Sequence, residues 1–333
     1  MIDLKKKPLA LIMLLFFSLP FAGCSQRRIT EPISETRLLL DTVCTITAYD
    51  PAQRQLLTEA LDLCAEYEAL LSRTLEGSDI WRINHAQGEP VMVEAPTAEL
   101  LRAGLDYGAF SGGCFDITVG RLSALWDFNG NPEVPSPIDL AAARDTADYR
   151  QVFITGNSVR LGNAESWLDL GGIAKGYIAD QLAGFLKGRG VESAIVDLGG
   201  NIVTVGAKPD NSLWHIGVEQ PFSERSEIIG SLSVGEASIV TSGIYERKFT
   251  ENGVLYHHIL DPSSGMPAES DVISVTIVSE SSTIGDALST IVILLGSEKS
   301  APLFEQTPGL MGAVLMLKSG ELVQYGDIDF TTK

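Results

Sequence analysis

Two polar side chains interrupt an otherwise apolar stretch over residues 282–295. Asp286 and Thr290 are four residues apart, so they share a face if this stretch is a helix. A carboxylate among apolar neighbours needs a partner, and a hard cation such as Mg²⁺ accepts carboxylate and hydroxyl oxygens. The spacing indicates either a small Mg²⁺ site or an aspartate that is stabilised by the dipole of the first helical turn.

A second candidate is the segment 168–180, LDLGGIAKGYIAD. Gly171 and Gly172 stand between a short strand and a helix expected over 173–187, where the backbone can approach a ligand closely. Lys175 adds a cation to the first turn, which is unfavourable for the helix alone but favourable beside a phosphate. A tight strand–helix corner with an exposed lysine would have the same sequence, and the glycine spacing matches neither a P-loop nor a dinucleotide fingerprint.

Two of the four histidines are adjacent in the segment 256–265, YHHILDPSSG. In a strand, His257 and His258 point to opposite faces, so only one of them belongs to a given site. A histidine beside a turn such as Asp261-Pro-Ser-Ser-Gly is either structural or a general base. The chain has no Gly-x-Ser-x-Gly elbow, which argues against a serine hydrolase, and nothing places Cys114 beside a base as a cysteine protease requires.

Two further features are local. The tetrapeptide Asp-Leu-Gly-Gly occurs at 169–172 and again at 197–200. The segment 111–126, SGGCFDITVGRLSALW, opens with small residues, which suit either a glycine-lined wall against a flat ligand or a plain turn into a strand.

The elements that must position these residues alternate irregularly. Helices are expected over 52–71, 96–110, 173–187 and 282–295, and a loop over 127–140. Strands are expected over 38–49, 151–161 (a pair that turns at Gly156-Asn157), 193–198, 213–219, 228–234, 254–260, 272–279, 311–318 and 321–325. This order favours an α+β class with mixed or antiparallel sheets and packed helices over a doubly wound fold.

Composition excludes several classes of protein. The chain has 333 residues, 45% hydrophobic and 20% charged, which is enough for a sizeable core and unlike a disordered chain. Its formal net charge is −19, and no cluster of Lys and Arg follows residue 28, so nucleic acid is not an expected partner. A single long apolar run, at the start, excludes a polytopic membrane protein.

The N-terminus has the features of an export signal. Lysines at 5–7 precede an apolar run over 9–22 that is short for a membrane span. The run ends in Phe21-Ala22-Gly23-Cys24, which is similar to the lipobox of bacterial lipoproteins. We therefore expect a signal peptide over 1–23, lipidation of Cys24 and a polar tether over 24–35. A soluble secreted protein or an uncleaved anchor, with Cys24 incidental, is the alternative.

Three cysteines remain after Cys24, at positions 44, 64 and 114. Their number is odd and none is in a Cys-x-x-Cys pair, so neither a disulfide framework nor a zinc site is expected, although an exported protein could hold disulfides. We predict that these cysteines are small buried residues.

Eight blocks, in this order along roughly residues 36–326, resemble the ApbE family of FAD:protein FMN transferases. The blocks are LLDTVCTITAYD (39–50), LSRTLEGSDIWRIN (71–84), SGGCFDITVGRLSALW (111–126), LDLGGIAKGYIAD (168–180), AIVDLGGNIVTVG (194–206), VTSGIYERKF (240–249), YHHILDPSSGMP (256–267) and GDALST (285–290). Their common order is far more specific than any block alone.

The resemblance implies one ApbE-like domain over 36–333, with a tunnelling-fold-like α+β architecture and FAD in a central cleft. It implies a Mg²⁺-dependent enzyme with FAD as substrate, which transfers FMN to a threonine hydroxyl of an acceptor flavoprotein and releases AMP. Lipoprotein members act at the extracytoplasmic face of the cell membrane on flavoproteins of electron-transfer systems, so a lipid-anchored location is expected.

The family's motifs also imply roles for individual residues. Mg²⁺ ligands are expected from Asp286, Thr290 and the backbone carbonyl of Gly172, and His258 is expected to be the general base, with a pKa near its ordinary value of about 6.5. Contacts with FAD are expected from Leu40, Thr74, Gly113, Cys114, Asp169, Lys175 and Leu260. Thr74 stands where the family usually has an aromatic residue that packs on the flavin nucleotide.

Two other functions stay open from the sequence. With water as the nucleophile, the same site would be a FAD pyrophosphatase that yields FMN and AMP. A non-catalytic flavin-binding lipoprotein would hold FAD without turnover. The chain has no Ser-Gly-Ala-Thr motif of the kind the family modifies, so self-flavinylation is not expected.

Overall fold

The computed structural model describes residues 31–223 and 227–333. The predicted signal peptide, 1–23, and Cys24 lie outside these residues. The first strand begins at Ile33, so the last three residues of the predicted tether, 33–35, belong to a strand. Within the described ranges, no helix is long and apolar enough to cross a membrane.

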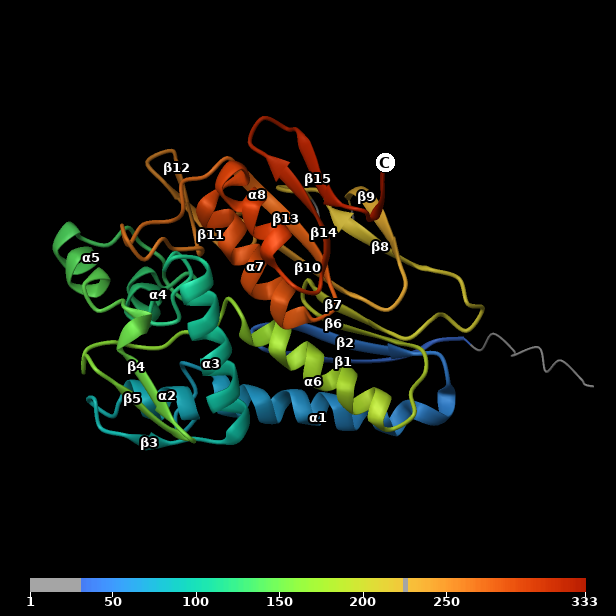
Figure 1. Cartoon of the computed structure of the whole chain (residues 1–333), viewed down its shortest axis with the longest axis horizontal. Coiled ribbons are helices and arrows are strands. Elements are labelled where there is room, and N and C mark those ends of the chain that lie inside the picture. The colour runs from blue at the N-terminus through green and yellow to red at the C-terminus, as the bar shows by residue number, and fades with distance from the viewer. Residues whose placement is uncertain (1–30, 224–226) are drawn as a thin grey trace, which may run out of the picture.

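An eight-stranded sheet forms the centre of the molecule (Figure 1), and all its neighbouring strands are antiparallel. In spatial order the strands are β1 (Ile33–Leu39), β2 (Thr42–Ala48), β6 (Ala194–Leu198), β7 (Asn201–Val205), β10 (Ser238–Gly243), β13 (Val272–Ser279), β14 (Leu310–Leu317) and β15 (Leu322–Gly326).

Three small antiparallel sheets surround the large one. They are β16-β9-β8 (Asp329–Thr332, Ile228–Val234 and Trp214–Glu219), β3-β5-β4 (Val91–Met92, Ser158–Leu161 and Val152–Thr155) and the hairpin β11-β12 (Lys248–Glu251 and Val254–His257).

Helices α1, α6 and α7 pack on strands of the large sheet (Figure 1). The helices are α1 (Arg54–Leu71), α2 (Asp79–Asn84), α3 (Ala95–Phe110), α4 (Gly120–Trp126), α5 (Pro137–Arg144), α6 (Ala174–Gly188), α7 (Ser282–Leu295) and α8 (Ser297–Gln306), with 3-10 turns η1 (Pro51–Gln53) and η2 (Tyr149–Gln151).

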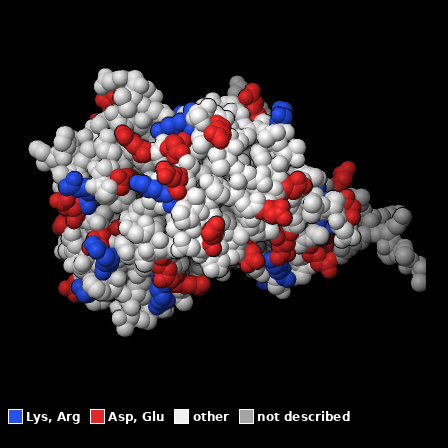
Figure 2. All heavy atoms as spheres, turned by 45° about the horizontal axis from the view of Figure 1, so that its top comes forward, with Lys and Arg blue, Asp and Glu red and all other residues white. Residues whose placement is uncertain are grey.

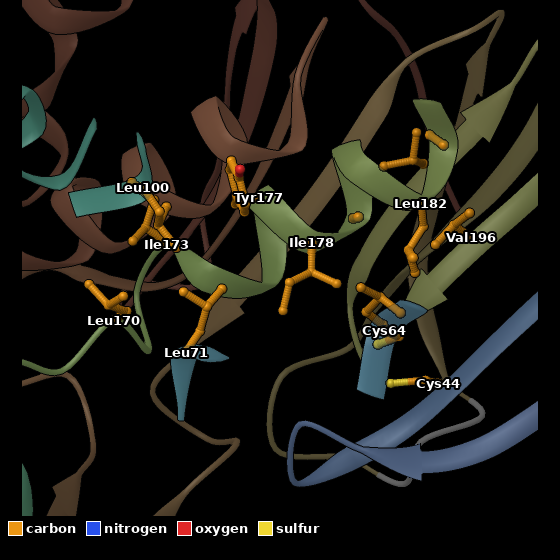
Figure 3. Packing of buried hydrophobic residues seen from close by; sticks show 14 of the residues in the cluster. Cys44, Cys64, Leu71, Leu100, Leu170, Ile173, Tyr177, Ile178, Leu182 and Val196 are labelled. Carbon is orange, nitrogen blue, oxygen red and sulfur yellow. The ribbon is translucent and has the colours of Figure 1, made fainter. Parts of the chain in front are cut away.

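The alternation of side chains along β6 and β7 produces two cores, one on each face of the large sheet. Val196 of β6 packs with α1 and α6, together with Tyr177 and Leu182 of α6 (Figure 3). Ile195 and Ile202 face the other way, toward the three-stranded sheet β16-β9-β8. The large sheet is therefore buried on both faces, and the helical face carries the predicted site segments.

The distribution of charged side chains on the surface agrees with the acidic composition. On the face drawn in Figure 2, acidic side chains are widely spread, and the basic ones stand among them singly or in small groups. The formal net charge of −19 is thus not offset by a continuous basic patch on this face.

The predicted α+β class is confirmed, and the four predicted helices are present to within two residues at each end. The predicted strand over 38–49 is strand over 38–39 and 42–48 but is not continuous, because the chain turns back at Leu40 and Asp41, whose φ angles are 55° and 57°. Such a turn usually contains Asn or Gly, so this sequence gave no turn signal. The predicted loop over 127–140 also includes the start of α5.

Candidate functional site

Helices α6 and α7, which carry the predicted phosphate and metal contacts, pack directly on each other. A Cβ atom on Gly176 would lie 2.2 Å from the carbonyl oxygen of Ser282 and 2.7 Å from Cβ of Asp286, so only glycine permits this approach. The backbone N–H of Gly176 donates to Oδ2 of Asp286 at 2.8 Å. The Asp286 carboxylate therefore lies at the N-terminus of α6, the positive end of that helix's dipole.

A single carboxylate of α6 fixes the start of α7. The carboxylate of Asp180 accepts hydrogen bonds from the backbone N–H groups of Ser282 and Thr283 at 2.7 and 2.9 Å, and from the hydroxyls of Ser281 and Thr283. The side chain of Ser281, at the N-cap position, makes no capping bond of its own. Asp180 thus replaces the usual cap and sets the position of Asp286 and Thr290 over the start of α6.

The structure brings the three predicted metal ligands together. A Cβ atom on Gly172 would lie 3.2 Å from Oγ1 of Thr290, and Asp286 precedes Thr290 by about one helical turn. Within residues 31–223 and 227–333, no group of three or more His, Cys, Asp or Glu side chains could hold a metal. A carboxylate, a hydroxyl and a backbone carbonyl are hard oxygen donors, and Mg²⁺ commonly takes few protein ligands, so this set fits Mg²⁺.

Lys175 is surrounded by carboxylates. Burial raises the pKa values of Asp286, Asp197 and Glu246, and the charge of Lys175 opposes the rise in each case. Lys175 lies in the first turn of α6, as predicted. Three carboxylates around one lysine leave an excess of negative potential when they are ionised, which favours the approach of a cation.

Asn201 is a buried polar residue at the start of β7, beside Asp286. It is 1% exposed, and neither its side-chain oxygen nor its nitrogen has a well-formed hydrogen bond among the described residues. Its polarity nevertheless lowers the pKa of Asp286, against the effect of burial. A buried amide without a well-formed partner is unusual, and its interaction with Asp286 places it beside the site.

The turn before α6 is held by an ion pair. Arg73 donates from Nε to Asp169 at 3.2 Å, and Asp169 also accepts from the N–H of Gly171 at 2.8 Å. Both charged side chains are about one-fifth exposed. Thr74 follows Arg73 and is exposed, and both its N–H and its hydroxyl form hydrogen bonds with Oγ of Ser72, at 3.2 and 3.3 Å.

The segments 111–126 and 256–267 meet next to the same turn. Phe115 contacts Gly172, where a Cβ atom would lie 3.1 Å from Cε2 of the ring. The charge of Asp261 reaches Cys114, whose pKa is raised mainly by burial. Nε1 of Trp126 donates to the carbonyl of Gly265 at 2.8 Å, which ties α4 to the second segment.

Two predicted FAD contacts in these segments have only their backbones available. Gly113 has φ 89° and donates its N–H to the carbonyl of Gly108. The side chain of Leu260 is buried in a small core with Leu122 and Trp126. Any contact of Leu260 with a ligand must therefore use its main chain.

The two histidines differ in their surroundings. His257 is buried, its Nε2 lies 3.1 Å from the carbonyl of Ala268, and burial lowers its pKa to about 4. His258 is half-buried, its Nδ1 has no partner among the described residues, and burial, helped by Arg247, lowers its pKa to about 3. The expected pKa near 6.5 for His258 is therefore wrong, because a cationic ring is poorly solvated here.

Leu40 lies apart from the other predicted contacts. It sits in the β1–β2 turn, and its N–H donates to Oε1 of Glu68 on α1 at 2.8 Å. The neighbouring Thr42 touches the second Asp-Leu-Gly-Gly segment at Gly199. The β1–β2 turn thus packs on the 197–200 turn, whose Asp197 is close enough to Lys175 for the lysine charge to lower its pKa.

Sequence reasoning missed five residues that build this site: Arg73, Gly176, Asp180, Asn201 and Glu246. Gly176 and Asp180 lie inside the quoted segment 168–180, and Asn201 follows the second Asp-Leu-Gly-Gly directly. The motifs pointed to these residues, but only the packing of α6 on α7 gives them a role. A separate hollow of about 520 Å³ between α8 and β14–β15 includes none of the predicted site residues.

The chain is similar to a known protein family and to several named proteins. The ApbE family model matches residues 40–315. A Treponema pallidum protein named FAD:protein FMN transferase is 35% identical over 309 residues, which cover 86% of this chain and 85% of that protein. A Klebsiella pneumoniae protein of the same name is 36% identical over 273 residues, which cover 80% and 84% of the two chains.

A solved structure shares the fold. The crystal structure of the ApbE protein from Thermotoga maritima matches with a TM-score of 0.82 at 32% identity, over 89% of this chain and 97% of that one. The range matched by the family model, 40–315, contains all of the site residues described above.

Proposed function

The chain belongs to the ApbE family, and from this membership and the α6–α7 site we propose that it is an FAD:protein FMN transferase. FMN would pass from FAD to a threonine hydroxyl of an acceptor protein, with AMP as the leaving group. The observation that carries the proposal is the junction of α6 and α7, where Gly172, Asp286 and Thr290 converge beside Lys175.

This arrangement suits phosphoryl transfer, in which positioning and charge neutralisation supply most of the rate. The N-terminus of α6 and the ammonium of Lys175 would face the pyrophosphate of FAD. Gly172, Asp286 and Thr290 would hold Mg²⁺, which neutralises phosphate charge. The hydrogen bond from the N–H of Gly176 to Oδ2 would hold the Asp286 carboxylate in position for this role.

His258 is the proposed general base. A pKa of about 3 keeps its ring neutral at ordinary pH, so a ring nitrogen is free to accept the threonine proton. A ring this weakly basic gains proton affinity when negative charge is close, and the phosphates of FAD would supply that charge in the complex. His257 has its own partner in Ala268 and takes no part in this step.

We also propose that the enzyme acts outside the cytoplasmic membrane, anchored by lipid on Cys24. The basic and apolar pattern of residues 1–23 and the small residues before Cys24 support this location. The acceptor would then be an extracytoplasmic flavoprotein of an electron-transfer system.

The test is a mass measurement on purified protein that begins at Ser25. It is incubated with FAD, Mg²⁺ and an acceptor domain that carries a Ser-Gly-Ala-Thr motif. We expect the acceptor to gain the mass of one FMN, an equal amount of AMP to appear, and both to be lost in EDTA. AMP and free FMN without labelling would instead indicate a pyrophosphatase, and bound FAD without AMP would indicate a carrier.

The residue-level test is Asp286→Asn, which keeps the size of the side chain and removes its charge. We expect transfer to fall by about 1,000-fold and Mg²⁺ binding, followed by calorimetry, to weaken in parallel, since metal and phosphate charge stabilisation supply several kcal/mol. Asp329→Asn, at an exposed position on β16, is the matched control. Transfer at the wild-type rate by a folded Asp286→Asn protein would remove Asp286 from the metal site.

A further inference from the structure

Two of the three cysteines in the described residues form a buried pair. Cys44 of β2 and Cys64 of α1 are both fully buried and lie next to each other at one end of the main core (Figure 3). The two thiols are close enough to shift each other's pKa, and the thiol of Cys44 donates to the carbonyl of Leu39 at 3.5 Å. Cys114 is half-buried and lies apart from them, near Asp261.

The interaction between the two thiols affects them differently. It lowers the pKa of Cys44, while the same interaction and burial raise the pKa of Cys64. A thiolate is the species that attacks a disulfide, so Cys44 is the better nucleophile of the two and Cys64 the partner that resolves the mixed disulfide.

The pair also lies between the β1–β2 hairpin and α1, two elements that contact each other. Cys64 and Glu68 are four residues apart on one face of α1, and Glu68 holds the N–H of Leu40 in the β1–β2 turn. Arg37 of β1 and Asp62 of α1 add an ion pair at the surface. A covalent bond between residues 44 and 64 would therefore fasten the β1–β2 hairpin to α1 at its buried side.

We propose that Cys44 and Cys64 form an intrachain disulfide when the protein folds in an oxidising compartment. Oxidised glutathione, or a protein disulfide of the same chemistry, takes the two electrons. Cys44 attacks that disulfide and releases one glutathione thiol, and Cys64 then displaces the second, so two protein thiols become one disulfide and two glutathione thiols form. The bond closes a loop of 20 residues, which removes conformations from the unfolded chain. This cross-link is independent of the proposed transferase activity.

The experiment starts from the purified full chain, unfolded in urea with reductant and refolded in a glutathione redox buffer, so that burial of the thiols does not limit access. Free thiols are alkylated in urea, and the protein is digested with trypsin. Cleavage after Arg37, Arg54 and Arg73 places Cys44 in peptide 38–54 and Cys64 in peptide 55–73, each as its only cysteine. We expect these two peptides to be recovered joined, two hydrogens lighter than their sum, and peptide 103–121 with Cys114 to be alkylated.

Thermal unfolding gives the second readout. The oxidised protein is expected to unfold about 5–10 °C above the same protein in reductant. The variant Cys114→Ser should keep this difference, and Cys44→Ala should abolish it. Recovery of peptides 38–54 and 55–73 separately alkylated after refolding would overturn the proposal, as would a link from either peptide to 103–121. Because the mapping uses the wild-type chain, a variant that fails to fold leaves the result unaffected.

Discussion

The tetrapeptide Asp-Leu-Gly-Gly forms two different structures in this chain. At 169–172 it leads into α6, and neither Gly171 nor Gly172 has a positive φ. At 197–200 it forms the turn of the β6–β7 hairpin, where Gly199 has φ 64° and Gly200 has φ 101°. The same four residues thus begin a helix in one place and reverse a strand in the other.

The two aspartates form similar hydrogen bonds within their turns but have different charged partners outside them. Asp169 accepts the N–H of Gly171, and Asp197 accepts the N–H groups of Gly199 and Gly200. Asp169 is then paired with Arg73, whereas the charge partner of Asp197 is Lys175. An aspartate that binds the N–H groups two and three residues on is a general turn device, so the repeated motif predicts a turn but not a site.

The glycines are needed for different reasons. Gly172 leaves room for Thr290 and Phe115, which a Cβ atom would approach to 3.2 and 3.1 Å. Gly199 is needed for its positive φ, and a Cβ atom there would also lie 2.1 Å from Oγ1 of Thr42. Gly172 is therefore expected to matter for the proposed site, and Gly199 for folding of the hairpin. Mutations can test this difference.

Among the variants of the two turns, the largest expected effect comes from Gly172→Ala. A methyl group between Thr290 and Phe115 shifts the turn by a few tenths of an ångström, and misplacement at a phosphoryl-transfer site is expected to lower the transfer rate by about 100-fold. The free energy of unfolding should change by less than about 1 kcal/mol, because the backbone conformation suits alanine. Transfer rate and urea unfolding are the two measurements.

Gly199→Ala is the matched variant and should show the opposite pattern. Its φ of 64° is unfavourable for alanine, so the free energy of unfolding should fall by about 1–3 kcal/mol. The folded fraction at low temperature should transfer FMN at nearly the normal rate. If Gly199→Ala lowers transfer as much as Gly172→Ala, the two turns are not functionally distinct.

Smaller effects are expected from substitution of Asp169 and Asp197, the aspartates of the two turns. Asp169→Asn removes the charge that holds Arg73 beside the Gly171-Gly172 turn, and we expect the KM for FAD to rise by about 10-fold. Asp197→Asn should leave the KM within about 2-fold, because Asn keeps the oxygen that accepts the glycine N–H groups. Steady-state kinetics with varied FAD measure both. Equal changes in KM would show that the charge of Asp197 beside Lys175 contributes as much to FAD binding as the charge of Asp169 beside Arg73.

The sequence predicted the helices, and the shared helix face of Asp286 and Thr290, because both depend on local pattern. The spacing of Asp286 and Thr290 places them on one helix face, and Gly172 was assigned by the family motif. The roles of Asp180 and Asn201 depend on contacts between segments about 100 residues apart, which no local period encodes. The pKa of His258 was not predicted for the same reason, because burial depends on the packed fold.

The adjacent histidines extend the comparison to two identical residues with different surroundings. At neutral pH we expect His257 to have little effect on stability, and its contribution appears only as the pH falls. Burial lowers the pKa of His257 to about 4, while the unfolded chain titrates near 6.5. The unfolded state therefore binds a proton that the folded state does not bind between these values, so stability present above pH 6.5 is lost as the pH falls toward 4. His257 should contribute a loss of about 1 kcal/mol per pH unit in this window.

The variant His257→Gln isolates this contribution, because glutamine can still donate to the carbonyl of Ala268 but does not titrate. Urea unfolding at pH 7, 6 and 5 should show a shallower pH dependence for the variant than for the wild type. The raised pKa values of Asp286, Asp197 and Glu246 change stability with pH in the opposite direction. They are common to both proteins, so their contribution cancels in the difference.

Transfer should persist in His257→Gln and fall in His258→Ala with little change in FAD affinity. The reverse ranking would make His257 the histidine of the site, and an unchanged pH slope would mean that its ring is solvated in the folded protein.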